Sequence, residues 1–83
     1  MIHLLIADDE ALERETLAQI VARRFEHEVV IKTAENGRKA ADTAVLWGTD
    51  LILMDIEMPG MNGLDAARAI LEQRPECKVI FVT

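Results

Sequence analysis

The sequence has little cysteine and few basic residues, and each shortage excludes a class of protein. Cys77 is the only cysteine, so the chain cannot form an internal disulfide, and a lone thiol is typical of a reducing cytosol. Lys and Arg number 9 against 15 Asp and Glu, which gives a formal net charge of −6. Nucleic-acid binders gather basic residues on one face, so we expect no nucleic-acid contact by this chain. The excess of carboxylates instead favours a site for a cation.

Long apolar runs are also absent from the sequence. The runs of consecutive apolar residues are far shorter than the roughly 20 residues that span a bilayer. The first residues, Met1-Ile2-His3, open into a strand-like run without the basic start of a signal peptide. We therefore expect a cytoplasmic protein without membrane contact, and 83 residues allow one small domain.

Four short apolar runs have the length of strands and are rich in Ile, Val and Leu. The first and third show little polar alternation, which is typical of parallel strands covered on both faces. The second contains Lys32, which favours an edge position. The runs are Ile2 to Ala7, Val29 to Thr33, Leu51 to Met54 and Val79 to Val82.

Three stretches with helical spacing separate these runs. The first extends from about Glu10 to Glu26, Asn36 can cap the second, and the third begins near Asn62-Gly63 and stops before Pro75. The positions whose spacing marks the first two helices are Leu12, Thr16, Leu17, Ile20, Val21 and Phe25, and then Ala40, Ala41, Ala44 and Val45. The third helix is expected to bury Leu64, Ala67, Ile70 and Leu71.

The elements therefore alternate as βαβαβαβ, which predicts a parallel sheet with helices on both faces because crossovers are right-handed. The fold class is α/β, a flavodoxin-like doubly wound sheet with three helices and the strand order 2-1-3-4. Doubly wound domains usually continue further, whereas this sequence stops at Thr83, at the end of its fourth strand. We therefore expect residues 1–83 to be an incomplete domain.

Carboxylates follow two strands that we expect to be neighbours. Asp8 and Asp9 come directly after the first strand, and Asp55 comes directly after the third. Neighbouring parallel strands end at the same edge of a sheet about 4.8 Å apart, so the three side chains converge in one pocket. Carboxylates this close raise one another's pKa values unless a cation intervenes. Mg²⁺, a hard cation held by carboxylate and carbonyl oxygens, fits this site best.

Each acidic segment also has a purely structural explanation. Asp8 and Asp9 stand at the start of a predicted helix, where acidic side chains favour the helix dipole. Asp55 precedes a loop that contains Pro59, so it also fits a turn residue. The joint placement of both segments at strand ends is what favours a functional site. The loop can also turn a backbone carbonyl, such as that of Glu57, towards the cation.

Three segments resemble the receiver domains of bacterial two-component response regulators, and the resemblance covers essentially the whole chain. Glu35-Asn36-Gly37 resembles the family too, and the loop after Asp55 is the most specific part. The three segments are Ile-Ala-Asp-Asp-Glu at 6–10, Leu-Ile-Leu-Met-Asp-Ile-Glu-Met-Pro-Gly-Met-Asn-Gly at 51–63 and Val-Ile-Phe-Val-Thr at 79–83.

The resemblance implies that Asp55 takes a phosphoryl group from a histidine of a sensor kinase. Asp9 and Asp55 would bind Mg²⁺ directly, the Glu57 backbone carbonyl would be a further ligand, and Asp8 would act mainly through water. Glu57 also matches a position that tunes hydrolysis of the acyl phosphate. Thr83 matches the hydroxyl residue that meets the phosphoryl oxygen when the domain switches. The chain would be a phosphoprotein and not an enzyme, and a DNA-binding output domain that regulates transcription would lie outside it.

The chain departs from the family in one respect that bears on its activity. The family has an essential lysine after its fifth strand and an aromatic switch residue on that strand, and Lys32, Lys39 and Lys78 do not occupy the lysine's place. The resemblance also implies that residues 1–83 are the N-terminal part of the domain, with the last helix, strand and helix missing. We therefore expect this piece to accept phosphate poorly. The alternative function is a receiver-like interaction scaffold without phosphotransfer. The open fourth strand also predicts a homodimer or a strand-exchanged oligomer.

Other families fit the loop after Asp55 less well. Cobalamin-binding domains have His where Glu57 stands, and phosphatases of the haloacid dehalogenase type have Asp there. No Gly-x-Gly-x-x-Gly sequence follows a strand, which argues against a dinucleotide site. His3 and His27 have no Cys or His at metal-ligand spacing, so we assign them no metal.

Overall fold

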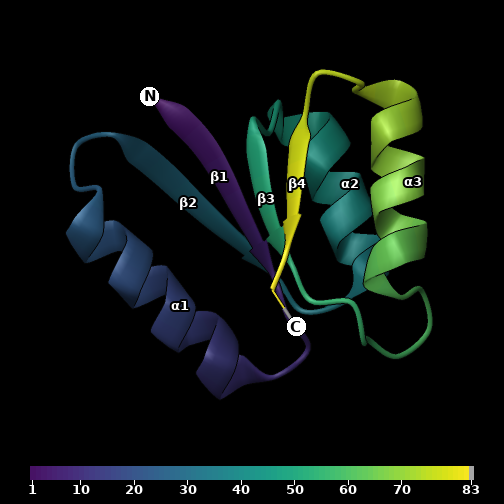
Figure 1. Cartoon of the computed structure of the whole chain (residues 1–83), viewed down its shortest axis with the longest axis horizontal. Coiled ribbons are helices and arrows are strands. Elements are labelled where there is room, and N and C mark those ends of the chain that lie inside the picture. The colour runs from purple at the N-terminus through teal and green to yellow at the C-terminus, as the bar shows by residue number, and fades with distance from the viewer. Residues whose placement is uncertain (83) are drawn as a thin grey trace.

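The structure, a computed structural model, describes residues 1–82, in which strands and helices alternate along the chain (Figure 1). The predicted bounds of the first and third strands agree with the structure, and those of the other elements differ by one or two residues. The elements are β1 (Ile2–Ala7), α1 (Ala11–Arg24), β2 (Val29–Ala34), α2 (Gly37–Trp47), β3 (Leu51–Met54), α3 (Gly63–Gln73) and β4 (Lys78–Phe81).

The strands of this region form one parallel sheet in the order β2-β1-β3-β4. α1 packs on one face of the sheet over β1 and β2, and α2 and α3 pack side by side on the other (Figure 1). This arrangement confirms the predicted fold class, the strand order and the edge position of β2. Because the order changes direction at β1, the ends of β1 and β3 become neighbours although they are far apart in the sequence.

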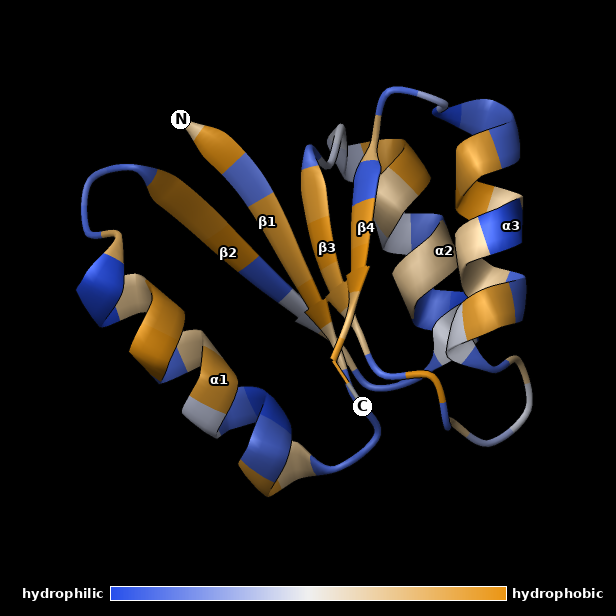
Figure 2. Ribbon diagram, viewed as in Figure 1, coloured by the Kyte–Doolittle hydropathy of each residue, from blue (hydrophilic) through white to orange (hydrophobic). Residues whose placement is uncertain are grey.

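Apolar side chains form one cluster on each face of the sheet. Leu5 and Ile52 pack with α2 and α3, whereas Leu4 and Ile6 point the other way and pack with α1. Figure 2 shows the apolar residues concentrated along the strands. Burial on both faces explains why β1 lacks the polar alternation of a half-exposed strand, and in β3 the residues on the α1 face, Leu51 and Leu53, are partly buried.

α1 buries fewer of its apolar positions than its length suggests. Leu12 and Ile20 are 77% and 58% exposed, while Val21 is buried and Leu17 packs beside it. The helix lies over β1 and the edge strand β2, so only the narrow stripe that contains Leu17 and Val21 meets the sheet.

The prediction that α3 buries Leu64 and Leu71 is wrong. These side chains are 51% and 40% exposed, and the buried positions include Ala66, Ala67 and Ile70. α3 packs against both α2 and the sheet, and small alanines allow this close approach while the larger leucines lie outside it.

An aromatic pair lies at the end of the sheet where β1 begins. The His3 ring stacks on the ring of Trp47 with their centroids 4.6 Å apart and an interplanar angle of 8°. The Lys32 ammonium lies 5.2 Å from the centroid of the Trp47 ring. The His3 amide donates a hydrogen bond to Oδ2 of Asp50 at 2.8 Å. These contacts attach the end of α2 to the start of β1.

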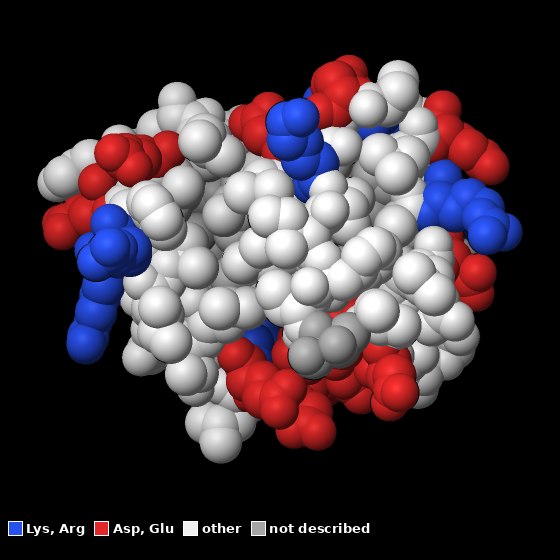
Figure 3. Space-filling model, in the orientation of Figure 1, with Lys and Arg blue, Asp and Glu red and all other residues white. Residues whose placement is uncertain are grey.

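Within residues 1–82, nothing covers the α1 face of the sheet over β3 and β4. The register pairs Ile80 with Leu53 on this face, and Ile80 is 49% exposed. Val82, which follows β4, is 37% exposed. Figure 3 shows uncharged atoms across the middle of the face in view, where Figure 1 places the strands. Among the helices of residues 1–82, none has the length and apolar content needed to cross a membrane.

Candidate functional site

Three carboxylates meet where β1 and β3 end. The register of the two strands pairs Ala7 with Met54, so Asp8 and Asp55, which follow them, leave the sheet side by side. One oxygen from each of Asp8, Asp9 and Asp55 lies within 4.8 Å of the other two. The structure therefore brings together the three carboxylates that the sequence predicts at one edge of the sheet.

The three carboxylates differ in exposure and in hydrogen bonding. Asp8 is buried, and its Oδ1 accepts a hydrogen bond from the Glu10 amide at 2.9 Å. Asp55 is partly buried, and its Oδ1 accepts a hydrogen bond from the Glu57 amide at 3.2 Å. Asp9 is exposed. Within residues 1–82 the structure shows no hydrogen bond to the second oxygen of Asp55, so that oxygen is available to a cation or a reactant.

Negative charge is crowded around Asp55. Burial is the main cause that raises the pKa of Asp55 above its ordinary value, and the hydrogen bond from the Glu57 amide opposes the rise. The charges of the neighbouring carboxylates, Asp8 first, raise the pKa further. The pKa of Glu13 is also raised, mainly by the charge of Glu10. A cation bound among these side chains would relieve the repulsion.

The loop that follows Asp55 is folded tightly against it. The Gly63 amide, at the start of α3, donates a hydrogen bond to the carbonyl of Ile56 at 2.8 Å. A β-carbon at Gly63 would overlap the carbonyl oxygen of Asp55 and would lie 2.9 Å from Cα of Ile56. The side chain of Asn62 caps α3 by accepting a hydrogen bond from the Asp65 amide at 2.9 Å. Glycine at position 63 therefore lets the helix begin directly against the backbone of Asp55.

An open hollow of about 430 Å³ lies over the cluster. Figure 3 shows acidic side chains gathered at the border of the molecule where the strands end. The hollow leaves Asp55 accessible from solvent at the same point where the carboxylates converge. Its lining residues are Asp9, Glu10, Glu13, Asp55, Glu57 and Val82.

The donor atoms of the site suit a hard divalent cation. Carboxylate oxygens with space for water molecules are the ligands that Mg²⁺ prefers in proteins. Asp8, Asp9 and Asp55 supply such oxygens, and the negative charges of Asp8 and Asp9 add to the burial that raises the pKa of Asp55. The residues present therefore fit a magnesium site.

The two remaining predicted site residues, Glu57 and Thr83, are not among the three converging carboxylates. The Glu57 side chain is exposed on the rim of the hollow. Thr83 lies outside the residues that the structure describes. A further residue of the site, Arg14, was not predicted from the sequence. Its Nη1 donates a hydrogen bond to the backbone carbonyl of Asp8 at 2.9 Å. The only signal for Arg14 was a basic residue one and a half helical turns after the acidic pair, which is common at helix surfaces.

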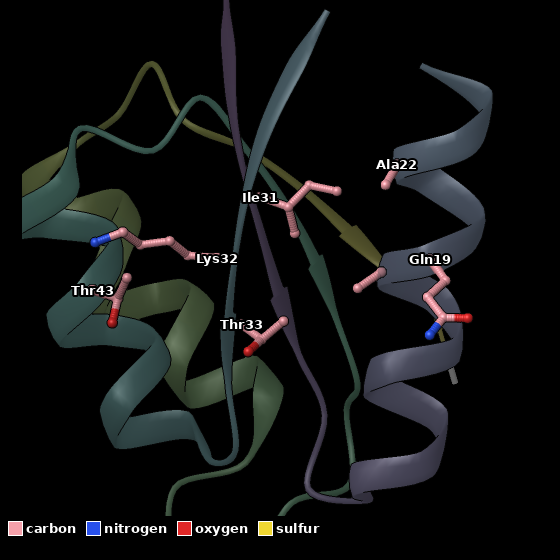
Figure 4. A pocket seen from close by; sticks show the side chains of 7 residues that line it. Gln19, Ala22, Ile31, Lys32, Thr33 and Thr43 are labelled. Atoms are coloured by element: carbon pink, nitrogen blue, oxygen red, sulfur yellow. The ribbon is translucent and has the colours of Figure 1, made fainter. Parts of the chain in front are cut away.

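Another hollow, with a volume of about 520 Å³, lies at the edge of β2 (Figure 4). Gln19 and Ala22 reach it from α1, and Lys32 and Thr43 lie on the opposite side of β2. Its lining contains no carboxylate, histidine or cysteine, so no general base stands beside its hydroxyl groups and no charged oxygen is present to hold a cation. The chemistry of the described residues is therefore concentrated at the ends of β1 and β3.

Comparison with known sequences points to one family. Residues 4–83 match the response regulator receiver domain family. The transcriptional regulatory protein LnrK of Bacillus subtilis is 40% identical over 83 residues, which are all of this chain and 37% of LnrK. The protein-glutamate methylesterase/protein-glutamine glutaminase 2 of Carboxydothermus hydrogenoformans is 46% identical over 74 residues, covering 89% of this chain and 21% of that relative. The chain thus spans well under half the length of these curated relatives.

Solved structures agree with the sequence match. The response regulator protein TrrA from Thermotoga maritima, in complex with Mg²⁺-BeF, has a TM-score of 0.89 at 36% identity, covering 98% of this chain and 68% of that one. The response regulator domain of CheB from Thermotoga maritima has a TM-score of 0.87 at 32% identity, covering 98% and 59%. Family match, sheet topology and strand-end carboxylates agree, and the chain belongs to the response regulator receiver domain family.

Proposed function

We propose that this chain is the phosphate-accepting module of a two-component response regulator and that Asp55 is the acceptor. The observation that carries the proposal is the convergence of Asp8, Asp9 and Asp55, with Asp55 lining an open hollow. The phosphoryl donor is a histidine of a sensor kinase, the partner that a receiver domain implies. As a receiver domain, the chain is a signalling module rather than a catalytic enzyme.

The chemistry that this geometry supports is a direct transfer to a carboxylate. An oxygen of Asp55 attacks the phosphorus of the phosphohistidine, a phosphorus–oxygen bond forms, and the phosphorus–nitrogen bond breaks. The electron pair of the broken bond stays on the imidazole. Positioning and charge neutralisation are most of what such a transfer requires. A partly buried carboxylate with a free oxygen at a strand end meets the positional requirement.

Mg²⁺ is the cofactor of the proposed function. Asp9, Asp55 and the backbone carbonyl of Glu57 would hold the ion, and Asp8 would act mainly through water. When bound, Mg²⁺ neutralises charge on the phosphoryl oxygens and on the carboxylates around them. The match to TrrA, whose structure contains Mg²⁺-BeF, supports this choice of ion.

Glu57 and Thr83 have further proposed roles. Glu57 lies two residues after the acceptor with its side chain exposed on the rim of the hollow, where it would meet water approaching an acyl phosphate on Asp55. We propose that Glu57 tunes this hydrolysis. The role of Thr83 as the switch hydroxyl stays a prediction from the family resemblance.

The whole protein is proposed to be longer than this chain. LnrK and DegU of Brevibacillus brevis are named transcriptional regulatory proteins, and the chain covers 37% and 34% of them. We propose that residues 1–83 are the N-terminal part of the receiver domain, that a helix, a strand and a helix complete it, and that a DNA-binding output domain belongs to the same protein.

An interaction scaffold without phosphotransfer is the second candidate, and the positions of the lysines favour it. Lys39 pairs with Glu35, Lys32 lies near Trp47, and Lys78 begins β4 at the end of the sheet away from Asp55. Within residues 1–82, no lysine therefore contacts the acidic cluster. A receiver that depends on such a lysine would accept phosphate poorly in this form.

Labelling with a small phosphodonor tests the two candidates. The chain is incubated with acetyl phosphate and Mg²⁺, and the gain of one phosphoryl group is measured by intact-protein mass spectrometry. The Asp55→Asn variant removes the proposed acceptor, and Asp42→Asn on the exposed side of α2 is the matched control. We expect weak labelling of the wild type and of Asp42→Asn, and none of Asp55→Asn.

The other outcomes distinguish the alternatives. Equal labelling of Asp55→Asn and the wild type would place the acceptor elsewhere. A wild-type chain that binds Mg²⁺ but gains no phosphoryl group would support the scaffold.

A further inference from the structure

We infer that Arg14 is a positioning residue that sets the orientation of the Asp8–Asp9 peptide for binding of the cation. This inference rests on the proposed function, because it concerns the magnesium site of that function. Arg14 lies in the second turn of α1 and is partly buried. Its Nη1 donates a hydrogen bond to the carbonyl oxygen of Asp8 at 2.9 Å.

The position of this hydrogen bond gives it an effect on Asp9. The carbonyl of Asp8 belongs to the planar peptide unit that joins Asp8 to Asp9. Fixing that oxygen therefore fixes the plane of the peptide and the position of the Asp9 Cα, from which the side chain starts. Asp9 is exposed, and within residues 1–82 no hydrogen bond to its carboxylate is present, so its placement depends on its backbone.

Other hydrogen bonds fix the backbone amide and the side chain of Asp8. The Asp8 amide donates to the carbonyl of Ala34 at 3.1 Å, and Oδ1 of Asp8 accepts a hydrogen bond from the Glu10 amide at 2.9 Å. Both bonds place Asp8 itself. In the described part of the chain, the Arg14 bond is the side-chain contact that holds the peptide between Asp8 and Asp9.

The charge of Arg14 has the opposite effect on cation binding from its hydrogen bond. A positive guanidinium beside a cation site repels the cation, so removal of the charge alone would tighten binding. Removal of the hydrogen bond frees the Asp8–Asp9 peptide and would weaken binding. Loss of a residue that orients metal ligands typically lowers metal affinity by about 10- to 100-fold. The sign of the change in affinity therefore shows which effect is larger.

The test measures binding of Mg²⁺ alone by isothermal titration calorimetry, with the full 83-residue chain. Arg14→Met removes the charge and the hydrogen bond but keeps an apolar stem of similar reach. Arg23→Met removes the same charge from an exposed position near the end of the same helix and serves as the control. We expect Arg14→Met to raise the Kd for Mg²⁺ about 10-fold, and Arg23→Met to leave it within twofold of wild type.

Salt and folding controls complete the experiment. The increase in Kd should persist at 0.5 M KCl, since screening removes charge effects but not the loss of orientation. Circular dichroism should show the wild-type helix content in Arg14→Met, and Arg14→Leu, which also removes the charge and the hydrogen bond, repeats the measurement if Arg14→Met does not fold. Tighter or unchanged binding by a folded variant would overturn the inference. If the wild type itself does not bind Mg²⁺, the proposed metal site is wrong and the inference falls with it.

Discussion

Among single residues, Asp55 links the stability of the fold to pH most directly. Its pKa is raised in the folded chain, first by burial and further by its acidic neighbours, against the hydrogen bond from the Glu57 amide. An acid whose pKa is raised on folding favours the folded state when it is protonated. This contribution is fully present below the ordinary pKa of Asp and is lost as pH rises through the raised value in the folded state.

We predict that Asp55→Asn stabilises the chain at pH 7 in the absence of divalent cations. The amide has the shape of the carboxylate but not its charge, so the cost of burying that charge and the repulsion from Asp8 and Asp9 are both removed. A gain of about 1 kcal/mol corresponds to a rise in Tm of about 4–8 °C for a domain of this size. Calorimetric melts at pH 7 and pH 3 check the prediction, because the gain should vanish at pH 3, where Asp55 is protonated.

The control for this prediction is Asp42→Asn, which removes an exposed charge away from the cluster. The Tm of Asp42→Asn should equal that of the wild type at both pH values. With Mg²⁺ in excess, the order of wild type and Asp55→Asn should reverse, since only the intact site gains stability from the ion. A lower Tm for Asp55→Asn at pH 7 without metal would contradict the prediction.

The sequence predicts the carboxylates of the site but not the residue that orients them. Asp8, Asp9 and Asp55 follow from where two strands end, because strand ends can be located from apolar runs and neighbours in a parallel sheet end together. The hydrogen bond from Arg14 to Asp8 depends on the exact path of the loop between β1 and α1. No spacing rule encodes that path, so only the structure shows it.

At the scale of elements, local chemistry predicts where helices start better than which faces they bury. Asn36 caps α2 as predicted, because its side chain accepts a hydrogen bond from the Lys39 amide at 2.8 Å. The buried face of a helix depends on how many neighbours it touches. Leu12 of α1 and Leu64 of α3 fit an apolar stripe but lie largely exposed.

A pair of alanine substitutions in α1 tests this difference. Val21→Ala should destabilise the chain by about 1–3 kcal/mol, because Val21 is buried against the sheet. Leu12→Ala, which shortens a residue that is 77% exposed, should change stability by less than about 0.5 kcal/mol. Urea unfolding of the two variants gives both values. Similar losses for the two would show that Leu12 is packed in solution.

At the scale of the whole molecule, the uncovered sheet face and the edge of β4 predict self-association. Ile80 is 49% exposed on the face that α1 leaves open, and exposed apolar sheet beside a free edge favours pairing with another chain. Sedimentation velocity at micromolar concentrations should show dimers or larger species. A monomer at all concentrations would contradict this prediction.

A charge placed on the open face locates the contact. Ile80→Lys should shift the sedimentation profile towards monomer, because burying an unpaired ammonium in an apolar contact is costly. Leu46→Lys changes a side chain that is 86% exposed on α2, on the opposite face of the sheet, and should leave the association unchanged. Equal effects of the two variants would indicate that added charge, rather than the open face, controls association.

The fluorescent residue Trp47, stacked on His3, lies at the opposite end of the sheet from the acidic site. Trp47 is the only tryptophan and the chain contains no tyrosine, so its ultraviolet emission comes from one point. That point lies where β1 begins, whereas Asp8 and Asp55 lie where the strands end. Indole fluorescence therefore follows the docking of α2 on β1 and should be insensitive to events at Asp55. Folding can be followed through Trp47 while a second, independent signal reports the acidic site in the same sample.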